Sequence, residues 1–203
     1  QPLKPGDKVY ANNADKTLAL FVIGSRPMEE GLRIIGAHVD SPRLDLKQNP
    51  LYEDSGLALS KTHYYGGVKK YQWVTLPLAI HGVVVKKDGS VVDIVIGEDD
   101  NDPVVGITDL LIHLAADQMD KKLSKAIEGE DLNVSMGSIP MGDKEDTARV
   151  KKNILRLLNE KYGINEEDFV SAELEVVPAG RARDYGLDRS MVMAYGHDDR
   201  VCA

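Results

Sequence analysis

Two apolar runs near the start of the chain have the pattern of buried β-strands. Residues 17–24 (TLALFVIG) and 32–39 (LRIIGAHV) are rich in branched side chains, and Pro27 and Gly31 lie in the stretch between them. Short, uninterrupted apolar runs are typical of covered strands, and Pro and Gly mark loops. The pattern therefore predicts two neighbouring strands joined by a loop.

A β-hairpin and a half-buried strand are predicted further along the chain. Residues 83–85 and 91–96 are dominated by valine and isoleucine, and the dipeptide Asp88-Gly89 lies between them. Asp-Gly flanked by such runs is the strongest short signal for a hairpin. Residues 170–177 (VSAELEVV) alternate apolar and polar positions. One face of that strand is therefore expected to meet a core and the other water.

Two amphipathic helices are predicted from apolar residues at helical spacing. The first runs from Thr108, a candidate N-cap, to Ile127. The second covers residues 148–162, with Thr147 as a candidate cap and Gly163 as the stop. Together with the strands, this inventory indicates a mixed α/β protein built from two units.

Composition narrows the class of protein. The 203 residues are 42% hydrophobic and 29% charged, with a formal net charge of −8. These values exclude intrinsic disorder, and the negative charge argues against nucleic acid as a partner. No apolar run approaches the roughly 18–20 residues of a membrane span, so no membrane partner is expected. The single cysteine, Cys202, favours a reducing, cytoplasmic compartment.

The first candidate site is His38-x-Asp40, at the end of the second predicted strand. In a strand these two side chains point to the same side, at the tip where loops and ligands meet. Neutral imidazole is a common zinc ligand, and a nearby carboxylate can orient it. The spacing alone leaves open a simpler interpretation, in which His38 is hydrogen-bonded within a turn and Asp40 caps it.

The second candidate site is Gly196-His197-Asp198-Asp199-Arg200, after a last apolar run at 191–195. Adjacent aspartates repel one another and need a compensating cation. Arg200 is one candidate for that cation. A divalent metal is the other, since one carboxylate can bridge two ions. A strand would place His197 on the face opposite Asp198, so His197 is not counted as a ligand.

Other motifs carry less chemistry. The acidic cluster at 98–102 lacks the spacing of a calcium loop and is predicted to be a solvated loop. Gly66-Gly67 and the lysines after it match neither phosphate-loop pattern, and the chain has no G-x-S-x-G motif. His113 lies on the apolar face of the predicted helix at 108–127, where a packing histidine is the default interpretation.

Four stretches together resemble the aspartyl aminopeptidase and aminopeptidase I family of zinc metallopeptidases. They are GAHVDSPRLDLK at 36–47, YYGGVKKYQW at 64–73, LIHLA at 111–115 and AYGHDDRVCA at 194–203. Their order and spacing cover nearly the whole chain. Such a set is far more specific than either candidate site alone.

The resemblance implies a role for each candidate residue. His38 matches the family's first zinc ligand, and Asp40 matches the acidic residue that orients it. Asp198 matches the carboxylate that bridges two zinc ions. His113 resembles a histidine that reaches the active site of a neighbouring subunit, where it would contact substrate. The implied reaction is release of acidic or neutral N-terminal amino acids from peptides by a metal-activated water.

The resemblance also implies an architecture. Residues 1–50 and 178–203 would be parts of one catalytic α/β domain, and residues 51–177 an inserted, largely antiparallel β plus helix domain for dimerisation. A large homo-oligomer built from dimers is implied as well. The chain starts at Gln1 and stops at Ala203, before the family's catalytic glutamate and remaining ligands. We therefore expect an internal piece of a longer enzyme, inactive alone.

Two other functions stay open at this stage. Tetrahedral aminopeptidases of a related metallopeptidase class share the H-x-D and DDR patterns, although the YGGVKKYQW stretch and the hairpin-bearing insertion argue against them. A non-catalytic assembly module is the alternative of a different kind. Bound zinc in a large particle would indicate the enzyme, and a metal-free particle would indicate the module.

Overall fold

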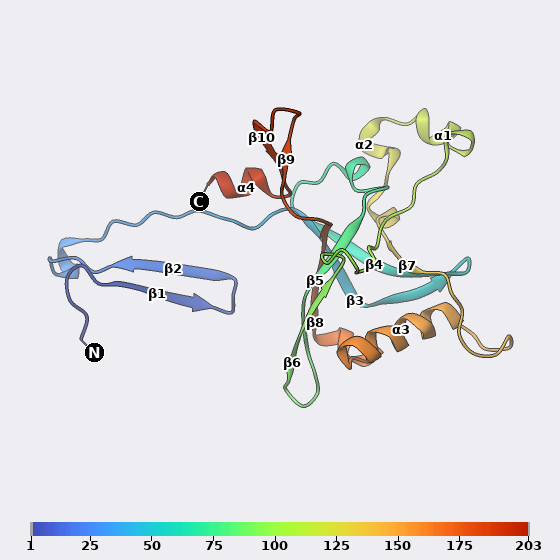
Figure 1. Cartoon of the computed structure of the whole chain (residues 1–203), viewed down its shortest axis with the longest axis horizontal. Coiled ribbons are helices and arrows are strands. Elements are labelled where there is room, and N and C mark those ends of the chain that lie inside the picture. Colours follow the sequence, from blue (N-terminus) through green and yellow to red (C-terminus); the bar gives the residue numbers. More distant parts are fainter. Residues whose placement is uncertain (1, 203) are drawn as a thin grey trace. The chain divides into compact units, whose positions relative to one another are not determined.

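The computed structural model describes residues 2–202, apart from the side chain of Asp198 (Figure 1). The chain divides into two compact units, residues 1–38 and residues 39–203. No helix among the described residues is long and apolar enough to cross a membrane.

The first unit is a β-hairpin followed by an extended segment. Strands β1 (Lys8–Asn13) and β2 (Thr17–Val22) pair antiparallel, and a 3-10 helix follows at Met28–Glu30. The predicted strand at 17–24 is thus confirmed as a strand, but it is not buried, because Leu20 is 73% exposed. A two-stranded hairpin has no second layer that could cover its apolar side chains.

The predicted strand at 32–39 is wrong. This segment has no strand pairing in the described structure, and Ile34 and Ile35 are 84% and 97% exposed. Apolar, branched residues favour extended backbone, but a strand forms only where a partner completes its hydrogen bonds. Within the unit, the described strand pairing is between β1 and β2, and this segment is not a strand of that sheet.

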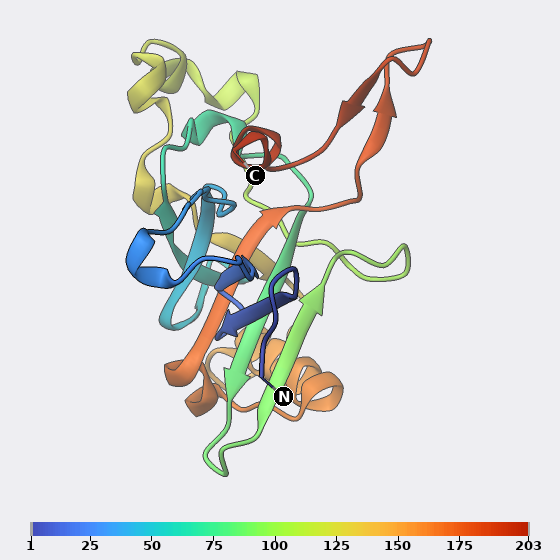
Figure 2. The same cartoon turned by 90° about the vertical axis from the view of Figure 1, so that its left-hand side faces the viewer.

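The second unit is built on a six-stranded antiparallel sheet with the order β6-β5-β8-β3-β4-β7. Figure 2 shows β8, β5 and β6 side by side in orange, green and light green. Isolated bridges join Leu78 in β5 to Val105, and Gly106 to Ser135 in β7. The sheet is therefore curled, and residues 105–106 connect its β5 side to β7. The strands are β3 (Arg43–Asp54), β4 (Leu57–Tyr65), β5 (Leu78–Val85), β6 (Val91–Ile96), β7 (Val134–Gly137) and β8 (Ala172–Pro178).

The inside of this curled sheet is the hydrophobic core. Its largest fully buried side chains come from all six strands and from two loops, as expected for alternating strands with one face toward a core. These side chains include Leu44, Leu78, Ile80, Ile94, Leu132, Ile164 and Val176. The predicted alternation at 170–177 is confirmed in β8, where Leu174 and Val176 are buried; the strand begins at Ala172 because a 3-10 helix occupies Glu166–Ser171.

The predicted hairpin is confirmed as β5–β6. Val85 pairs with Val91, and Gly89 in the turn has φ +83°, which glycine adopts without strain. Asp88 Oδ1 accepts hydrogen bonds from the backbone N–H of Ser90 at 2.9 Å and from its hydroxyl at 2.6 Å. Local turn chemistry therefore determines this element.

The predicted helix at 148–162 is confirmed as α3 (Arg149–Tyr162), which buries Val150, Ile154 and Leu158. Gly163 ends it in the left-handed region at φ +63°. The predicted cap Thr147 is wrong: Ala148 occupies the N-cap position, without a capping side chain.

A glutamate from another element supplies the cap of α3 instead. Glu53 Oε2, on β3, accepts hydrogen bonds from the backbone N–H groups of Val150 at 2.7 Å and Lys151 at 3.0 Å. A carboxylate at this position pairs with two otherwise unsatisfied donors and with the positive end of the helix dipole. The cap therefore comes from tertiary structure, which no local sequence rule reveals.

The predicted helix at 108–127 is wrong. The segment forms a 3-10 helix at Ile112–Leu114 and two single turns, α1 (Ala116–Met119) and α2 (Leu123–Ala126). Most of its large apolar side chains are exposed, Leu111 to 71% and Leu114 to 70%, whereas Ile127 at its end is buried. Most helical stability in proteins comes from packing of the apolar face, and this face packs on little within the unit.

The end of the chain is a second hairpin and a short helix. β9 (Arg183–Tyr185) and β10 (Met191–Met193) pair antiparallel and project from the sheet, followed by α4 (His197–Val201) (Figure 1). The strand predicted before Gly196 is confirmed for 191–193. His197 and Asp198 lie in a helix, however, so the opposite-face argument that set His197 aside does not apply.

The architecture is therefore mixed α/β with a large curled antiparallel sheet. β3 spans the expected domain boundary at residue 50, with a shift in its pairing register between Leu46 and Leu51. β8 ends at Pro178, next to the expected boundary at 177. The division into domains 1–50, 51–177 and 178–203 stays a prediction.

Candidate functional site

Asp40 makes a direct contact with the sheet. It lies just before β3, in a stretch without regular structure, and Tyr65 Oη at the end of β4 donates a hydrogen bond to Asp40 Oδ2 at 2.8 Å. This hydrogen bond, together with the negative charge of Asp40, raises the pKa of Tyr65. The phenol therefore keeps its proton and acts as a donor.

Arg43 fixes the ring of Tyr65 from the neighbouring strand. The two residues are directly opposite in the β3–β4 register, and the Arg43 guanidinium carbon lies 4.2 Å from the ring centroid. Arg43 Nε lies 2.8 Å from Asp45 Oδ1 and 2.9 Å from Glu175 Oε1. Asp45 and Glu175 pair across β3 and β8, so Arg43 also neutralises two adjacent like charges.

The segments around the two candidate motifs meet within the second unit. Tyr195 Oη donates to the backbone oxygen of Pro42, and Arg200 donates to Ser41 Oγ at 2.5 Å. Ser41 is buried. Gly196 leaves no room for a side chain, since a β-carbon there would lie 2.6 Å from Ser41 Oγ. Segments about 155 residues apart in sequence are thus in contact.

Tyr195 is the most perturbed ionisable group at this contact. Its ring packs edge-on against Trp73, with centroids 6.3 Å apart. Burial, followed by the negative charge of Asp199, raises the pKa of Tyr195 to about 12. The folded chain therefore binds this proton more tightly than an exposed tyrosine would, and the hydroxyl donates to Pro42.

The four predicted site residues lie in different places. His38 is the last residue of the first unit, and Asp40 lies at the start of the second; both are exposed. Asp198 lies in α4, and its side chain is outside the description. His113 lies in the 3-10 helix Ile112–Leu114 and is exposed rather than packed in a core. Their roles stay predictions.

The donors suit zinc in kind, but they are few. Imidazole and carboxylate are ordinary zinc ligands, and catalytic zinc sites use three protein ligands. Among the described side chains, no group of three or more His, Cys, Asp or Glu is arranged to hold a metal. The residues present therefore fit part of a zinc site.

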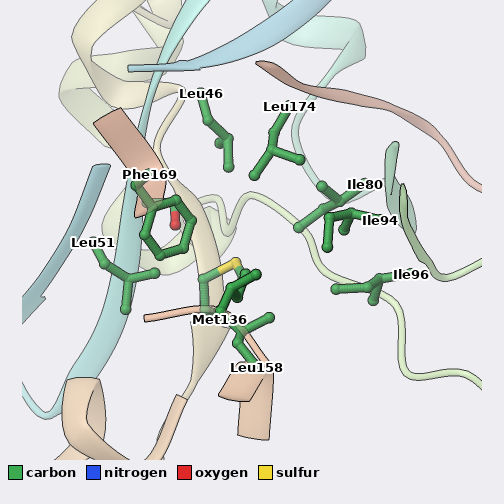
Figure 3. Close-up of a pocket in the computed structure, with 11 residues that line it drawn as sticks. Leu46, Leu51, Ile80, Ile94, Ile96, Met136, Leu158, Phe169 and Leu174 are labelled. Carbon is green, nitrogen blue, oxygen red and sulfur yellow. The ribbon is translucent and has the colours of Figure 1, made fainter. Parts of the chain in front are cut away.

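The inside of the curled sheet offers no site for a substrate. A cavity of about 10 Å³ lies there, and Figure 3 shows leucine, isoleucine, methionine and phenylalanine side chains pointing into it. Ser60 contributes a buried hydroxyl without a hydrogen-bond partner. This volume holds about one water molecule, which is too little for a substrate.

Sequence reasoning missed the residues that connect this region. The sequence shows Tyr65 only as part of a stretch that resembles the family, and it indicates no role for Tyr195 or Ser41. Arg200 was considered only as a countercharge for the aspartates, whereas it donates to Ser41. The position of Tyr65 just before Gly66-Gly67 is the one sequence signal for its role. The register of β3 and β4 is also needed to show that Tyr65 lies near Asp40.

Comparison with known proteins identifies the family. The model of the M18 family, aminopeptidase I zinc metalloprotease, matches residues 1–203. A relative from Clostridium acetobutylicum, a probable M18 family aminopeptidase 1, is 68% identical over all 203 residues. This chain spans 44% of the length of that relative.

Solved structures agree with the sequence match. The crystal structure of aminopeptidase I from Clostridium acetobutylicum has a TM-score of 0.90 at 67% identity, over 98% of this chain and 44% of the other. An M18 aminopeptidase from Thermotoga maritima has a TM-score of 0.89 at 51% identity, over 98% of this chain and 43% of the other.

A more distant structure shares the fold. The mApe1 dodecamer of S. cerevisiae has a TM-score of 0.62 at 20% identity, over 93% of this chain and 40% of the other. Because the family model matches all 203 residues of this chain and the relatives above are similar to it over that length, the chain belongs to the M18 family of aminopeptidase I zinc metalloproteases.

Proposed function

We propose that this chain is part of a zinc aminopeptidase and contributes His38 and Asp198 to a site for two zinc ions. The observation that carries the proposal is the contact between the two motif-bearing segments, through Ser41–Arg200 and Pro42–Tyr195. It joins residues next to Asp40 with the helix that contains Asp198. Family membership supplies the metal and the class of reaction.

Each residue has a separate role in this proposal. His38 and Asp198 would be the residues of this chain that hold zinc, and Asp198 would be the carboxylate that both ions share. Asp40 orients the His38 imidazole by accepting its second ring N–H, as carboxylates commonly do for ligating histidines. When bound, zinc lowers the pKa of a coordinated water and polarises the scissile carbonyl. Arg200 and Tyr195 hold the ligand-bearing segments together.

The substrate is the N-terminal residue of a peptide, acidic or neutral. We assign the remaining ligands and the catalytic glutamate to parts of the protein beyond this sequence, since relatives are more than twice as long. Two donors fall short of the three that catalytic zinc sites use. The 203-residue chain in excess zinc should therefore not hydrolyse aminoacyl chromogenic substrates, and clear turnover would overturn this assignment.

The architecture and assembly belong to the same proposal. Residues 1–50 and 178–203 would form parts of the catalytic domain, and 51–177 an inserted dimerisation domain. The exposed apolar residues around His113, including Leu111 and Leu114, suit a surface that another subunit covers. His113 would then contact substrate in the neighbouring active site of a large homo-oligomer.

The test uses the full-length protein. Its hydrolysis of Asp, Glu and Leu aminoacyl substrates is measured alongside bound zinc and particle mass by light scattering. Turnover of at least one substrate by a zinc-containing large particle is expected. A metal-free particle without turnover would refute the enzyme and indicate an assembly module.

A further inference from the structure

We infer that Tyr65 is a positioning residue for the candidate zinc site, because its hydroxyl holds the Asp40 carboxylate in the orientation that fixes the His38 imidazole. The inference rests on the proposed function, which gives Asp40 and His38 their roles. The observation behind it is the 2.8 Å hydrogen bond from Tyr65 Oη to Asp40 Oδ2.

The hydrogen bond from Tyr65 ties the Asp40 side chain to the sheet. Residues 39–42 form no helix or strand, and Asp40 is exposed. The carboxylate of an aspartate rotates in a broad torsional well. A hydrogen bond at one oxygen fixes the carboxylate plane and thereby the direction of the other oxygen. A carboxylate has about four lone-pair sites, so a bond from Tyr65 and one from an imidazole N–H are compatible.

The sheet in turn holds Tyr65. Arg43 lies opposite it in β3, with its guanidinium carbon 4.2 Å from the ring centroid. Asp45 on β3 and Glu175 on β8 anchor Arg43 through its Nε, and the Arg43 side chain is only 18% exposed. Three strands therefore fix the ring, and the ring places the hydroxyl next to Asp40.

The hydroxyl contributes little to the fold itself. Tyr65 is 43% exposed, and a hydrogen bond at such a position adds little to the free energy of folding. Its loss should therefore appear in metal binding rather than in stability. Groups that directly orient metal ligands typically contribute 10–100-fold in metal affinity or activity. Tyr65 acts one bond further out, so we expect about 3–10-fold.

The experiment measures the zinc dissociation constant of the full-length protein by competition with a chelator. The variants are Tyr65→Phe, which keeps the ring over which Arg43 lies, and Tyr64→Phe as the control. Tyr64 is the adjacent residue, is similarly exposed at 40%, and stacks on His63 instead. Asp40→Ala, alone and combined with Tyr65→Phe, shows whether Tyr65 acts through Asp40. Melting temperatures report on folding.

Tyr65→Phe should weaken zinc binding about 3–10-fold with an unchanged melting temperature, and Tyr64→Phe should have no effect. In the Asp40→Ala background, Tyr65→Phe should cause no further loss. Wild-type affinity in Tyr65→Phe, or the same loss in both backgrounds, would overturn the inference.

His38→Ala separates this inference from the proposed function. If His38→Ala loses zinc while Tyr65→Phe binds it normally, only the positioning role is refuted. If His38→Ala itself retains wild-type affinity, the proposed function fails and the role of Tyr65 fails with it.

Discussion

Gly82 is a single residue on which the pairing of two central strands depends. It lies in β5 with φ +143°, opposite Leu174 in β8. A β-carbon at this position would lie 1.9 Å from the backbone oxygen of Glu173, far inside van der Waals contact. The β5 and β8 backbones can therefore approach this closely only with glycine here.

Gly82→Ala should lower the free energy of unfolding of the chain by about 2–4 kcal/mol, because both the clash and the positive φ oppose alanine. Gly67→Ala is the matched control, since Gly67 has no atom within 4 Å of its would-be β-carbon and no positive φ. Urea denaturation measures both. Equal stability of the two variants would contradict the account of β5–β8 packing.

The raised pKa of Tyr195 predicts that the free energy of unfolding decreases at high pH. Its pKa is raised to about 12 in the folded chain, mainly by burial, against about 10 when unfolded. The folded chain therefore holds this proton more tightly. Its contribution to stability is fully present below about pH 10 and is lost as pH rises through about 12.

This shift is measured by a difference titration. The near-ultraviolet absorbance of tyrosinate is followed in the wild type and in Tyr195→Phe, and circular dichroism identifies the pH range in which both stay folded. The part of the absorbance change that is present in the wild type and absent in Tyr195→Phe should have a midpoint pH well above that of the other tyrosines. If the absorbance change that is lost in Tyr195→Phe has a midpoint near pH 10, Tyr195 is not buried against Pro42.

At the scale of elements, the start of α3 depends on a residue from a strand. Glu53→Ala removes the acceptor of two backbone N–H groups and should destabilise the chain by about 1–2 kcal/mol. Glu160→Ala removes only an exposed ion pair with Arg156, so it should cost about 0.3–0.5 kcal/mol. Chemical denaturation compares them, and a smaller effect for Glu53→Ala would refute the cap.

Elements that depend on local chemistry were predictable from sequence. The β5–β6 hairpin follows from Asp88-Gly89 between β-branched runs, and α3 from its apolar spacing and Gly163. The segments 32–39 and 108–127 lack the strand and helix that their apolar patterns predict, because such patterns become regular structure only against a partner. Ile35 and Leu111 are instead exposed.

At the scale of the whole molecule, the candidate motifs were visible in the sequence but their connections were not. His38-x-Asp40 and the Asp198-Asp199 pair carry recognisable chemistry at fixed spacing. The Ser41–Arg200 contact joins residues 159 apart, and such contacts depend on topology rather than on local pattern. Tyr65 reaches Asp40 only because β3 and β4 pair in one register.

The central claim is that His38 and Asp198 hold zinc in the complete enzyme, and the most direct test is the zinc content of the full-length protein. His38→Ala and Asp198→Ala are compared with the wild type and with two exposed controls, His63→Ala and Asp100→Ala. We expect the first two variants to lose zinc at unchanged oligomeric state, while the controls keep it. Wild-type zinc content in both His38→Ala and Asp198→Ala would contradict it.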